Sequence, residues 1–200
     1  MPLPDFPWET TRLTLRPFRP DDPDDLDDLH AYRSRPDVHR YLYTEPADRA
    51  DSEANLRKKS RWTVVAENEP LVLAAEWRAT GRVVGEVNLV LRSREHRQGE
   101  IGYVFHPDFH GRGFATEASR VMLAVAFDSL GLHRVCGRLD ARNTASARVL
   151  ERLGMRREAH LRENEWVKGE WTDEVVYAML AREWAARRDP AEAPRQAEAP

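Results

Sequence analysis

The chain has 200 residues, 41% of them hydrophobic, which is enough for one well-packed core and too little for two. Its formal net charge of −3 gives no support to a general nucleic-acid-binding function. A single cysteine excludes an internal disulfide and suits a reducing, cytoplasmic environment. We expect no secretory signal, since the first residues lack a basic flank and an apolar run, and no membrane span, since no apolar stretch is long enough.

The first third of the chain predicts one strand and two helices. Residues 12–18 alternate in polarity and predict a strand. The aspartate-rich run that follows suggests a cation site, but its spacing is more typical of a helix start. Asp21 or Asp22 can cap a helix that has Pro23 and further acids in its first turn. A second helix is expected at 52–61.

The middle of the chain changes to a two-residue period, which indicates antiparallel strands. We predict strands at 71–78, 82–91 and 99–105, a helix at 114–130, a strand at 133–140, a helix at 144–153 and closing strands at 155–162 and 166–180, the second of them broken at Lys168-Gly169. This order gives an α/β layer fold, a mostly antiparallel mixed sheet flanked by helices, with one strand–helix–strand crossover at 100–140. One domain is expected at 10–186, followed by a disordered tail at 187–200 that has little to bury.

A short glycine motif, Gly111-Arg112-Gly113, stands at the junction of a predicted strand and a predicted helix. Glycines there let backbone N–H groups converge at the positive end of the helix dipole, an arrangement that binds phosphate. The motif alone is a weak signal, since a tight turn without a ligand has the same pattern. The dinucleotide fingerprint fails because Thr116 stands where a third glycine is required, and a Walker loop fails because Gly-Lys-Ser/Thr is absent.

The wider context of this motif is more specific. Residues 105–118 read Phe-His-Pro-Asp-Phe-His-Gly-Arg-Gly-Phe-Ala-Thr-Glu-Ala, and Asn-Thr-Ala-Ser-Ala-Arg-Val-Leu-Glu-Arg-Leu-Gly starts at Asn143. The first string resembles the acetyl-CoA pyrophosphate loop of the GNAT acetyltransferases, and the second resembles that family's second cofactor motif. With Arg-Leu-Thr-Leu-Arg-Pro at 12–17 and Val-Lys-Gly-Glu-Trp-Thr-Asp at 167–173, the resemblance extends over most of the chain and is closest to the RimJ/RimL-like branch.

The resemblance implies acetyl-CoA as co-substrate, with its pyrophosphate on the glycine loop. The expected cofactor-binding residues of the two motifs are His110, Gly111, Arg112, Gly113, Phe114, Ala115, Thr116, Asn143 and Ser146. Because the pantetheine arm is an amide chain, it can pair with a free strand edge at Val104 and Phe105. In the family a bulge separates the next strand and leaves this edge free, and the resemblance implies the same here.

Acetyl transfer to an amine calls for a base that removes a proton from the ammonium group. Burial in a sheet raises the pKa of a carboxyl, as a base working near neutral pH needs. Glu100 opens the strand that leads to the loop, and Glu86 lies mid-strand among apolar neighbours. We expect Glu100 to be the base and keep Glu86 as the alternative, although pairing with an arginine is the commoner role of such a glutamate. No metal is expected, since the histidines are scattered.

The departing thiolate calls for a hydrogen-bond donor. Many members of the family carry a tyrosine seven residues after the motif asparagine, where this chain has Leu150. The RimJ/RimL-like branch offers a hydroxyl at the position of Ser146 instead. We expect Ser146 to stabilise the thiolate, while a capping or solvent-facing role stays open.

These features predict an acetyl-CoA-dependent N-acetyltransferase in which a primary amine attacks the thioester directly. The acceptor, a protein N-terminus or a small-molecule amine, is not specified by the sequence, and neither are the acyl length and a homodimeric assembly. Two alternatives come from other functional classes. A non-catalytic acyl-CoA-binding sensor would keep the loop without a base, and a nucleotide-binding regulatory module would use it for another phosphate.

Overall fold

The computed structural model describes residues 5–187 and the backbone of 195–196. In these residues nine strands form one sheet, ordered β7-β8-β6-β5-β4-β3-β2-β1-β9. The strands are β1 Trp8–Glu9, β2 Leu13–Arg16, β3 Pro70–Trp77, β4 Arg82–Ser93, β5 Gln98–Phe105, β6 Arg134–Asp140, β7 Arg156–Val167, β8 Glu170–Leu180 and β9 Arg195–Gln196. Neighbouring strands pair antiparallel except β5 and β6, which are parallel. The predicted mixed, mostly antiparallel sheet is confirmed.

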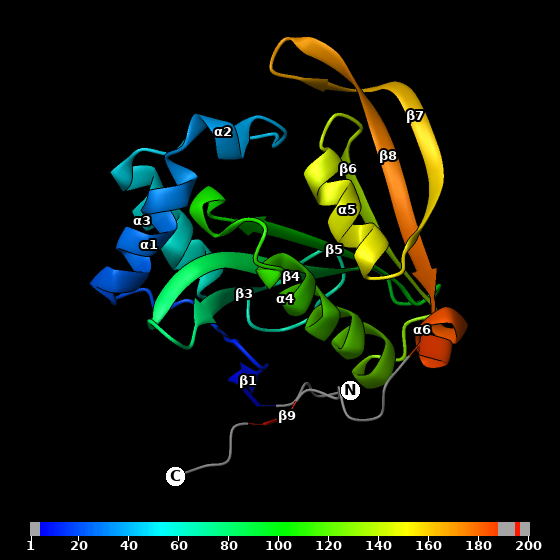
Figure 1. Ribbon diagram of the computed structural model, residues 1–200, viewed down its shortest axis with the longest axis horizontal. Coiled ribbons are helices and arrows are strands. Elements are labelled where there is room, and N and C mark those ends of the chain that lie inside the picture. Colours follow the sequence, from blue (N-terminus) through cyan, green and yellow to red (C-terminus); the bar gives the residue numbers. More distant parts are fainter. Residues whose placement is uncertain (1–4, 188–194, 197–200) are drawn as a thin grey trace.

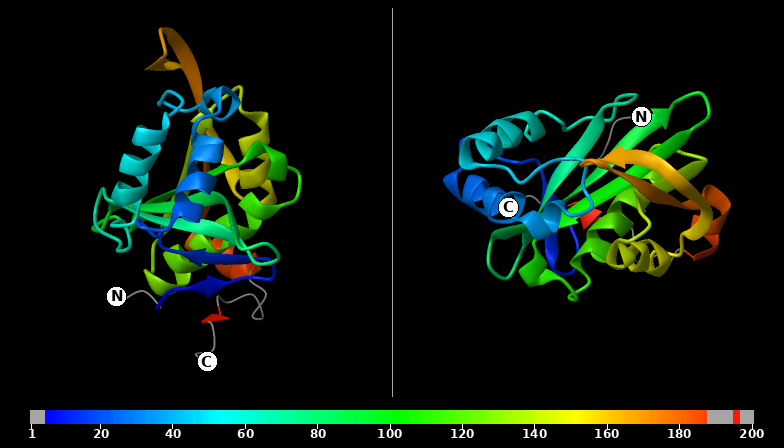
Figure 2. Two further views of the ribbon diagram at one scale, coloured as in Figure 1. Left: turned by 90° about the vertical axis from the view of Figure 1, so that its left-hand side faces the viewer. Right: turned by 90° about the horizontal axis from the view of Figure 1, so that it is seen from above.

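Helices cover both faces of the sheet (Figures 1 and 2). The α-helices of the described residues are α1 Pro23–Arg33, α2 Pro36–His39, α3 Arg49–Lys59, α4 Phe114–Ala124, α5 Thr144–Arg152 and α6 Ala181–Arg187. Leu29 and Tyr32 of α1 and Leu56 of α3 pack against β3 and β4 in one apolar cluster. A larger cluster on the other face contains α4 and Leu150 of α5. The sheet therefore separates two hydrophobic layers.

The helix predicted at 114–130 changes type along its length. It is α-helical to Ala124 and continues as a π-helical turn, Val125–Ser129. The Leu130 N–H donates to the carbonyl of Val125 at 2.9 Å, which closes the wider turn. The crossover from β5 through α4 to β6 has the predicted order.

The aspartate run at the start of α1 supplies a cap and two ion pairs, of which the Asp25–Arg16 pair is buried. The Asp22 carboxylate accepts the N–H two residues on at 2.9 Å, as the sequence predicts. Asp25 and Asp28 are buried on the inner face of the helix. Asp25 receives two hydrogen bonds from Arg16, at 2.6 and 2.8 Å, and Asp28 pairs with Arg82 at 2.6 Å. These pairs join α1 to β2 and β4.

The end of the chain forms the β7–β8 hairpin and one short strand. Strand β7 extends beyond its predicted end at 162 to Val167, with a register shift against β8 between Leu161 and Glu165, and the predicted break at Lys168-Gly169 is the turn of the hairpin, which projects beyond the body of the molecule (Figure 1). Arg195–Gln196, within the expected tail at 187–200, pairs with β1 through the backbone, which requires no apolar side chain. The rest of the tail after Arg187 lies outside the described residues. No helix among the described residues is long and apolar enough to cross a membrane.

Gly85 of β4 tests how tightly the end of β5 is packed. A Cβ at Gly85 would lie 2.6 Å from the carbonyl oxygen of Val104 and 2.5 Å from the Phe105 ring. We expect Gly85→Ala to lower the free energy of unfolding by about 3 kcal/mol, at the upper end of overpacking costs. Gly131→Ala is the control, since a Cβ there meets nothing within 4 Å and only the positive φ of 62° is strained. Denaturant titrations with equal losses for both variants would contradict this account.

Candidate active site

Strands β5 and β6 separate soon after they start. They pair at three positions only, Gln98 with Arg134, Gly99 with Val135 and Glu100 with Cys136. From there β6 stays paired with β8 as far as Asp140 opposite Glu174, while β5 stays paired with β4 as far as Phe105. The side of β5 that faces β6 is therefore free of strand pairing from Ile101 onward. This is the free edge that the resemblance implies, and it includes Val104 and Phe105. The pairing of β4 with β5 shifts register at one place, between Leu91 and Ser93, and is regular alongside Val104 and Phe105.

A cavity of about 340 Å³ opens in this split. Its lining residues come from several elements that are distant in the sequence. They include 101–104 of β5, 137–140 of β6, Asn143, Ser146 and Leu150 of α5, the loop 41–44 after α2, and Glu165, Val167 and 172–174 of the β7–β8 hairpin. Arg33, Glu86 and Asn88 complete it on the side of α1 and β4. The cavity thus connects the free edge of β5 with the hairpin.

Tyr103 and Ser146 form a hydroxyl pair across the split. The Tyr103 hydroxyl donates to the carbonyl oxygen of Ser146 at 2.9 Å, and its oxygen lies 2.9 Å from Ser146 Oγ. Because a phenol has one proton, the second contact uses the proton of Ser146. Burial raises the pKa of Tyr103 well above its usual value, so the phenol stays protonated. The sequence indicates no role for Tyr103 at the site, because its partner Ser146 lies 43 residues away.

Asn143 places Ser146 in the first turn of α5. Its side-chain oxygen accepts the Ser146 N–H at 3.0 Å and so caps the helix. Leu150, one turn further along the same face, is buried against Gly137, where a Cβ would lie 2.8 Å from it. The asparagine motif therefore builds the wall of the cavity that carries the serine hydroxyl.

The glycine loop has the backbone expected of a phosphate cradle. Gly111 and Gly113 have positive φ, 74° and 82°, and a Cβ at Gly111 would meet nothing within 4 Å. The Glu117 N–H donates to the carbonyl of Gly113 at 3.0 Å, so the amides of 114–116 precede the first helical bond and have no partner within α4. The Thr116 hydroxyl oxygen is buried without a hydrogen-bond partner. These unpaired donors fit a diphosphate group.

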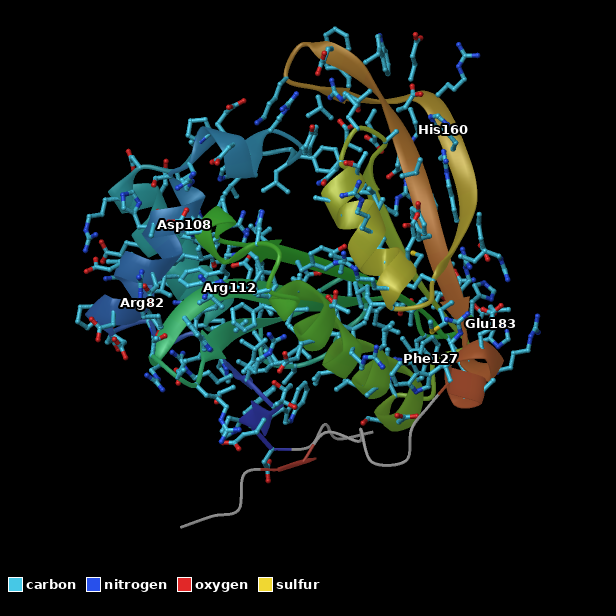
Figure 3. All side chains as sticks on the ribbon, viewed as in Figure 1. Arg82, Asp108, Arg112, Phe127, His160 and Glu183 are labelled. Carbon is cyan, nitrogen blue, oxygen red and sulfur yellow. The ribbon has the colours of Figure 1, made fainter. Side chains whose placement is uncertain are left out.

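Side chains of the loop are held by protein contacts. His110 Nε2 donates to the carbonyl of Phe105 at 3.0 Å, since a carbonyl can only accept. Arg112, labelled at the start of α4 in Figure 3, lies over the Trp77 ring at 5.5 Å, and its carbonyl accepts from Arg12 at 2.7 Å. The backbone of the loop is thereby fixed while its amides stay available.

Glu86 lies at the inner end of the cavity in a buried ion cluster. Its side chain is 3% exposed and accepts hydrogen bonds from Lys59 at 2.6 Å, from Tyr32 at 3.1 Å and from Arg33. Burial raises the pKa of the carboxyl, but the charges and hydrogen bonds of Lys59 and Arg33 outweigh it and lower the pKa to about 2. The expectation that burial would raise this pKa to that of a working base is wrong for Glu86, because two cations are buried with it.

Glu100 is not part of the cavity lining. It stands at the last paired position of β5 and β6, and its carboxylate contacts the half-exposed Arg92 at 3.1 Å. Tyr103 lies three residues further along the strand and hence on its opposite face. The structure does not bring Glu100 and Ser146 together, so the geometry gives no support to Glu100 as the base.

No group of three or more His, Cys, Asp or Glu side chains within the described part of the chain is arranged to hold a metal ion.

Comparison with known proteins identifies the family. Residues 12–156 match the model described as Acetyltransferase (GNAT) domain. The uncharacterized N-acetyltransferase YnaD of Bacillus subtilis (strain 168) is 31% identical over 175 residues, which cover 88% of this chain and 97% of the relative. The spermidine N(1)-acetyltransferase of Escherichia coli (strain K12) is 22% identical over 165 residues, covering 79% and 82%. The crystal structure of a GNAT-family acetyltransferase from Bacillus anthracis matches with a TM-score of 0.79 at 29% identity, covering 89% of this chain and 100% of that chain.

The chain therefore belongs to the GNAT acetyltransferase family and is an N-acetyltransferase. Members of this family use acetyl-CoA as the acetyl donor. The matches do not favour the sensor or the nucleotide-binding module.

Removing the Glu86 charge should destabilise the protein. In Glu86→Gln, Lys59 and Arg33 stay buried without their carboxylate, and we expect a loss of about 3–5 kcal/mol in the free energy of unfolding. Glu100→Gln is the matched control, since its ion pair is partly exposed and should contribute less than about 1 kcal/mol. Equal losses in denaturant titration would contradict the cluster.

The same cluster predicts acid sensitivity. The carboxyl of Glu86 has its pKa lowered from 4.5 to about 2 in the folded protein, so its contribution to stability is complete above pH 4.5 and is lost as the pH falls toward 2. The difference in unfolding free energy between wild type and Glu86→Gln should therefore shrink over that range. A difference that stays constant from pH 5 to pH 2.5 would contradict the lowered pKa.

Proposed function

We propose that this enzyme transfers an acetyl group from acetyl-CoA to the primary amine of a small-molecule or peptide acceptor that enters the split from the hairpin side. The observation that supports this proposal most is the cavity in the β5–β6 split, which meets the free edge of β5 and the Ser146 hydroxyl. The relative named as a spermidine acetyltransferase supports a small-molecule amine. The test is thiol release from acetyl-CoA with a panel of primary amines, and release that no amine stimulates would overturn the proposal.

The cofactor would be held by its phosphates and by its amide arm. The amides of 111–116 and the buried Thr116 hydroxyl would bind the pyrophosphate, and the free edge of β5 around Val104 would pair with the arm. The Val104 backbone pairs with Glu86 of β4 and the Phe105 carbonyl is bound to His110, so the backbone groups of Tyr103 and the Phe105 N–H are the ones that face the split. When bound, acetyl-CoA supplies an activated acetyl thioester.

On the thiolate side, Ser146 Oγ carries the proton that we assign to the departing sulfur. Tyr103 accepts this proton in a hydrogen bond in the resting structure and holds the backbone of Ser146 at the same time. A rotation about the Cβ–Oγ bond suffices to turn the proton from Tyr103 toward the sulfur. Tyr103 is thus a positioning residue for Ser146, and a serine hydroxyl acts here by hydrogen bonding rather than as a strong acid.

On the amine side, we propose that the proton leaves to water in the cavity. Glu86 is an anion at neutral pH and binds two cations, so it is a poor proton acceptor. Glu100 is outside the cavity. Because only one cysteine is present and the cofactor is a cytoplasmic metabolite, we also propose that the enzyme works in the cytoplasm.

A mutant series tests the hydroxyl pair. Ser146→Ala should lower kcat by about 10–100-fold, or about 1.4–2.7 kcal/mol of barrier, with little change in KM for acetyl-CoA. Tyr103→Phe should lower kcat less, and the double variant should be no slower than Ser146→Ala, because Tyr103 acts through the serine. Glu100→Gln should keep nearly the full rate. Additive effects in the double variant, or loss of activity in Glu100→Gln, would contradict these roles.

The phosphate cradle is tested by Gly113→Asp, which places negative charge where the pyrophosphate would bind. We expect CoA affinity measured by calorimetry to fall more than tenfold, above about 1.4 kcal/mol. Gly81→Asp makes the same change at another positive-φ glycine, in the β3–β4 turn, and should leave CoA binding unchanged. Unchanged CoA binding in a folded Gly113→Asp protein would remove the loop from the site.

A further inference from the structure

One carboxylate of the cavity lacks the basic side-chain partner that the others have. Glu86, Asp140, Asp173 and Glu174 line the cavity and contact Lys59 and Arg33, Arg142, His160 and Arg138 respectively, with nitrogen–oxygen distances below 3 Å. Glu165 also lines the cavity, yet within residues 5–187 no Lys, Arg or His nitrogen forms an ion pair with it. The only hydrogen bond of its carboxylate there is a long contact of 3.4 Å from Asn164.

The register of the hairpin turns this carboxylate toward the cavity. Glu165 stands opposite Thr172, which is 6% exposed and also lines the cavity. The next pair, Trp166 and Trp171, is on the other face, where both rings are 59% exposed. Opposed residues of an antiparallel pair share a face, so the Glu165 side chain lies on the Thr172 side. A half-buried carboxylate in this position has lost part of its hydration without gaining a counter-charge.

Tyr43 stands at the same part of the cavity. It lines the cavity, and its side chain is 68% exposed. Partial desolvation raises the pKa of Tyr43, and the charges of Glu165 and Glu174 are the next causes, so Tyr43 borders the carboxylates of the hairpin side of the cavity. An aromatic face beside a carboxylate attracts an ammonium group through both the ring quadrupole and the charge.

The hairpin tip fixes these two groups relative to one another. Lys168 Nζ donates to the carbonyl of His39 at 2.7 Å and lies 3.6 Å from the Glu45 carboxylate. These contacts tie the tip to the segment that follows α2 and carries Tyr43, and Figure 1 shows the hairpin extending toward that side of the molecule. His160, labelled on β7 in Figure 3, keeps Asp173 paired at 2.7 Å, which leaves Glu165 as the available carboxylate among the hairpin residues that line the cavity.

We propose that Glu165 and Tyr43 form a subsite for a second ammonium group of the acceptor, so that the preferred substrates are diamines. The inference rests on the proposed function and deepens it. Thr172, and with it Glu165, lies two residues beyond the position where β6 ends opposite Glu174, whereas Tyr103 and Ser146 lie at the split itself. A diamine bound in this way places one nitrogen at the split and the other at the hairpin.

The test uses two acceptors of equal length and shape. In 1,4-diaminobutane and n-pentylamine, an ammonium group of the first takes the place of a methyl group of the second. The wild-type enzyme should prefer the diamine by about tenfold or more in kcat/KM, as expected for a charge-assisted contact. Glu165→Gln should abolish this preference through a higher KM for the diamine, with the kcat/KM for pentylamine changed less than about twofold.

The matched control is Glu163→Gln, which removes the same charge from an exposed position of the same strand. It should keep the preference for the diamine. Calorimetric titration with 1,4-diaminobutane should show the same loss in Glu165→Gln and none in the control. A second pair, alanyl-lysine amide and alanyl-norleucine amide, distinguishes a peptide from a small molecule as the source of the second ammonium.

Equal use of both members of each pair by the wild type would overturn the subsite, and so would equal effects of the two glutamine variants. Turnover of pentylamine without any preference for the diamine would overturn the subsite and leave the proposed function intact. Loss of turnover with every amine, while CoA still binds, would instead overturn the proposed function.

Discussion

The active site depends on the short length of the β5–β6 pairing. Parallel strands that stayed paired would bury the edge of β5 and close the cavity. Here β6 keeps its full pairing with β8, while α5 packs so closely on Gly137, the first residue of β6 after the split, that a Cβ there would overlap Leu150. Because of the split, α5 packs at a fixed position beside β5. Only in this arrangement does Tyr103 of one strand reach Ser146 of a helix.

The phosphate cradle has an equally remote support. The Glu117 carboxylate, one turn into α4, accepts from the Thr10 hydroxyl at 2.6 Å and from the Arg12 N–H and Nε at 2.9 and 2.7 Å. Arg12 also donates to the carbonyl of Arg112 in the loop. The start of the chain thus sets the orientation of α4, whose first amides form the cradle. Arg12 belongs to the string at 12–17 and Glu117 to the string at 105–118, so their contact joins two of the segments that carry the resemblance.

Sequence reasoning succeeds here where the cause of a feature is local. The alternation of β3–β5, the Asp22 cap and the positive φ of Gly111 and Gly113 follow from neighbouring residues, and all are present. Prediction from the sequence fails where the interaction partner of a residue is distant in the sequence and close only in the folded chain. Glu86 is surrounded by apolar residues in sequence, yet its cations come from 27 and 53 residues away. The pairing of Arg195–Gln196 with β1 carries no side-chain signal at all.

The two glutamates at opposite ends of the cavity show how one residue type can serve two electrostatic purposes. At the inner end, the Glu86 carboxylate is outnumbered by Lys59 and Arg33, so the local charge is positive. At the hairpin, Glu165 has no cation of its own within the described residues, so the local charge is negative. A negative entrance concentrates ammonium acceptors, and neighbouring cations lower the pKa of an ammonium that approaches them. An amine that moves inward therefore binds as a cation and loses its proton more readily near the split. With such a charge gradient, no single side chain has to be a strong base. This agrees with the state of Glu86, the most deeply buried carboxylate of the cavity, which is held in ion pairs.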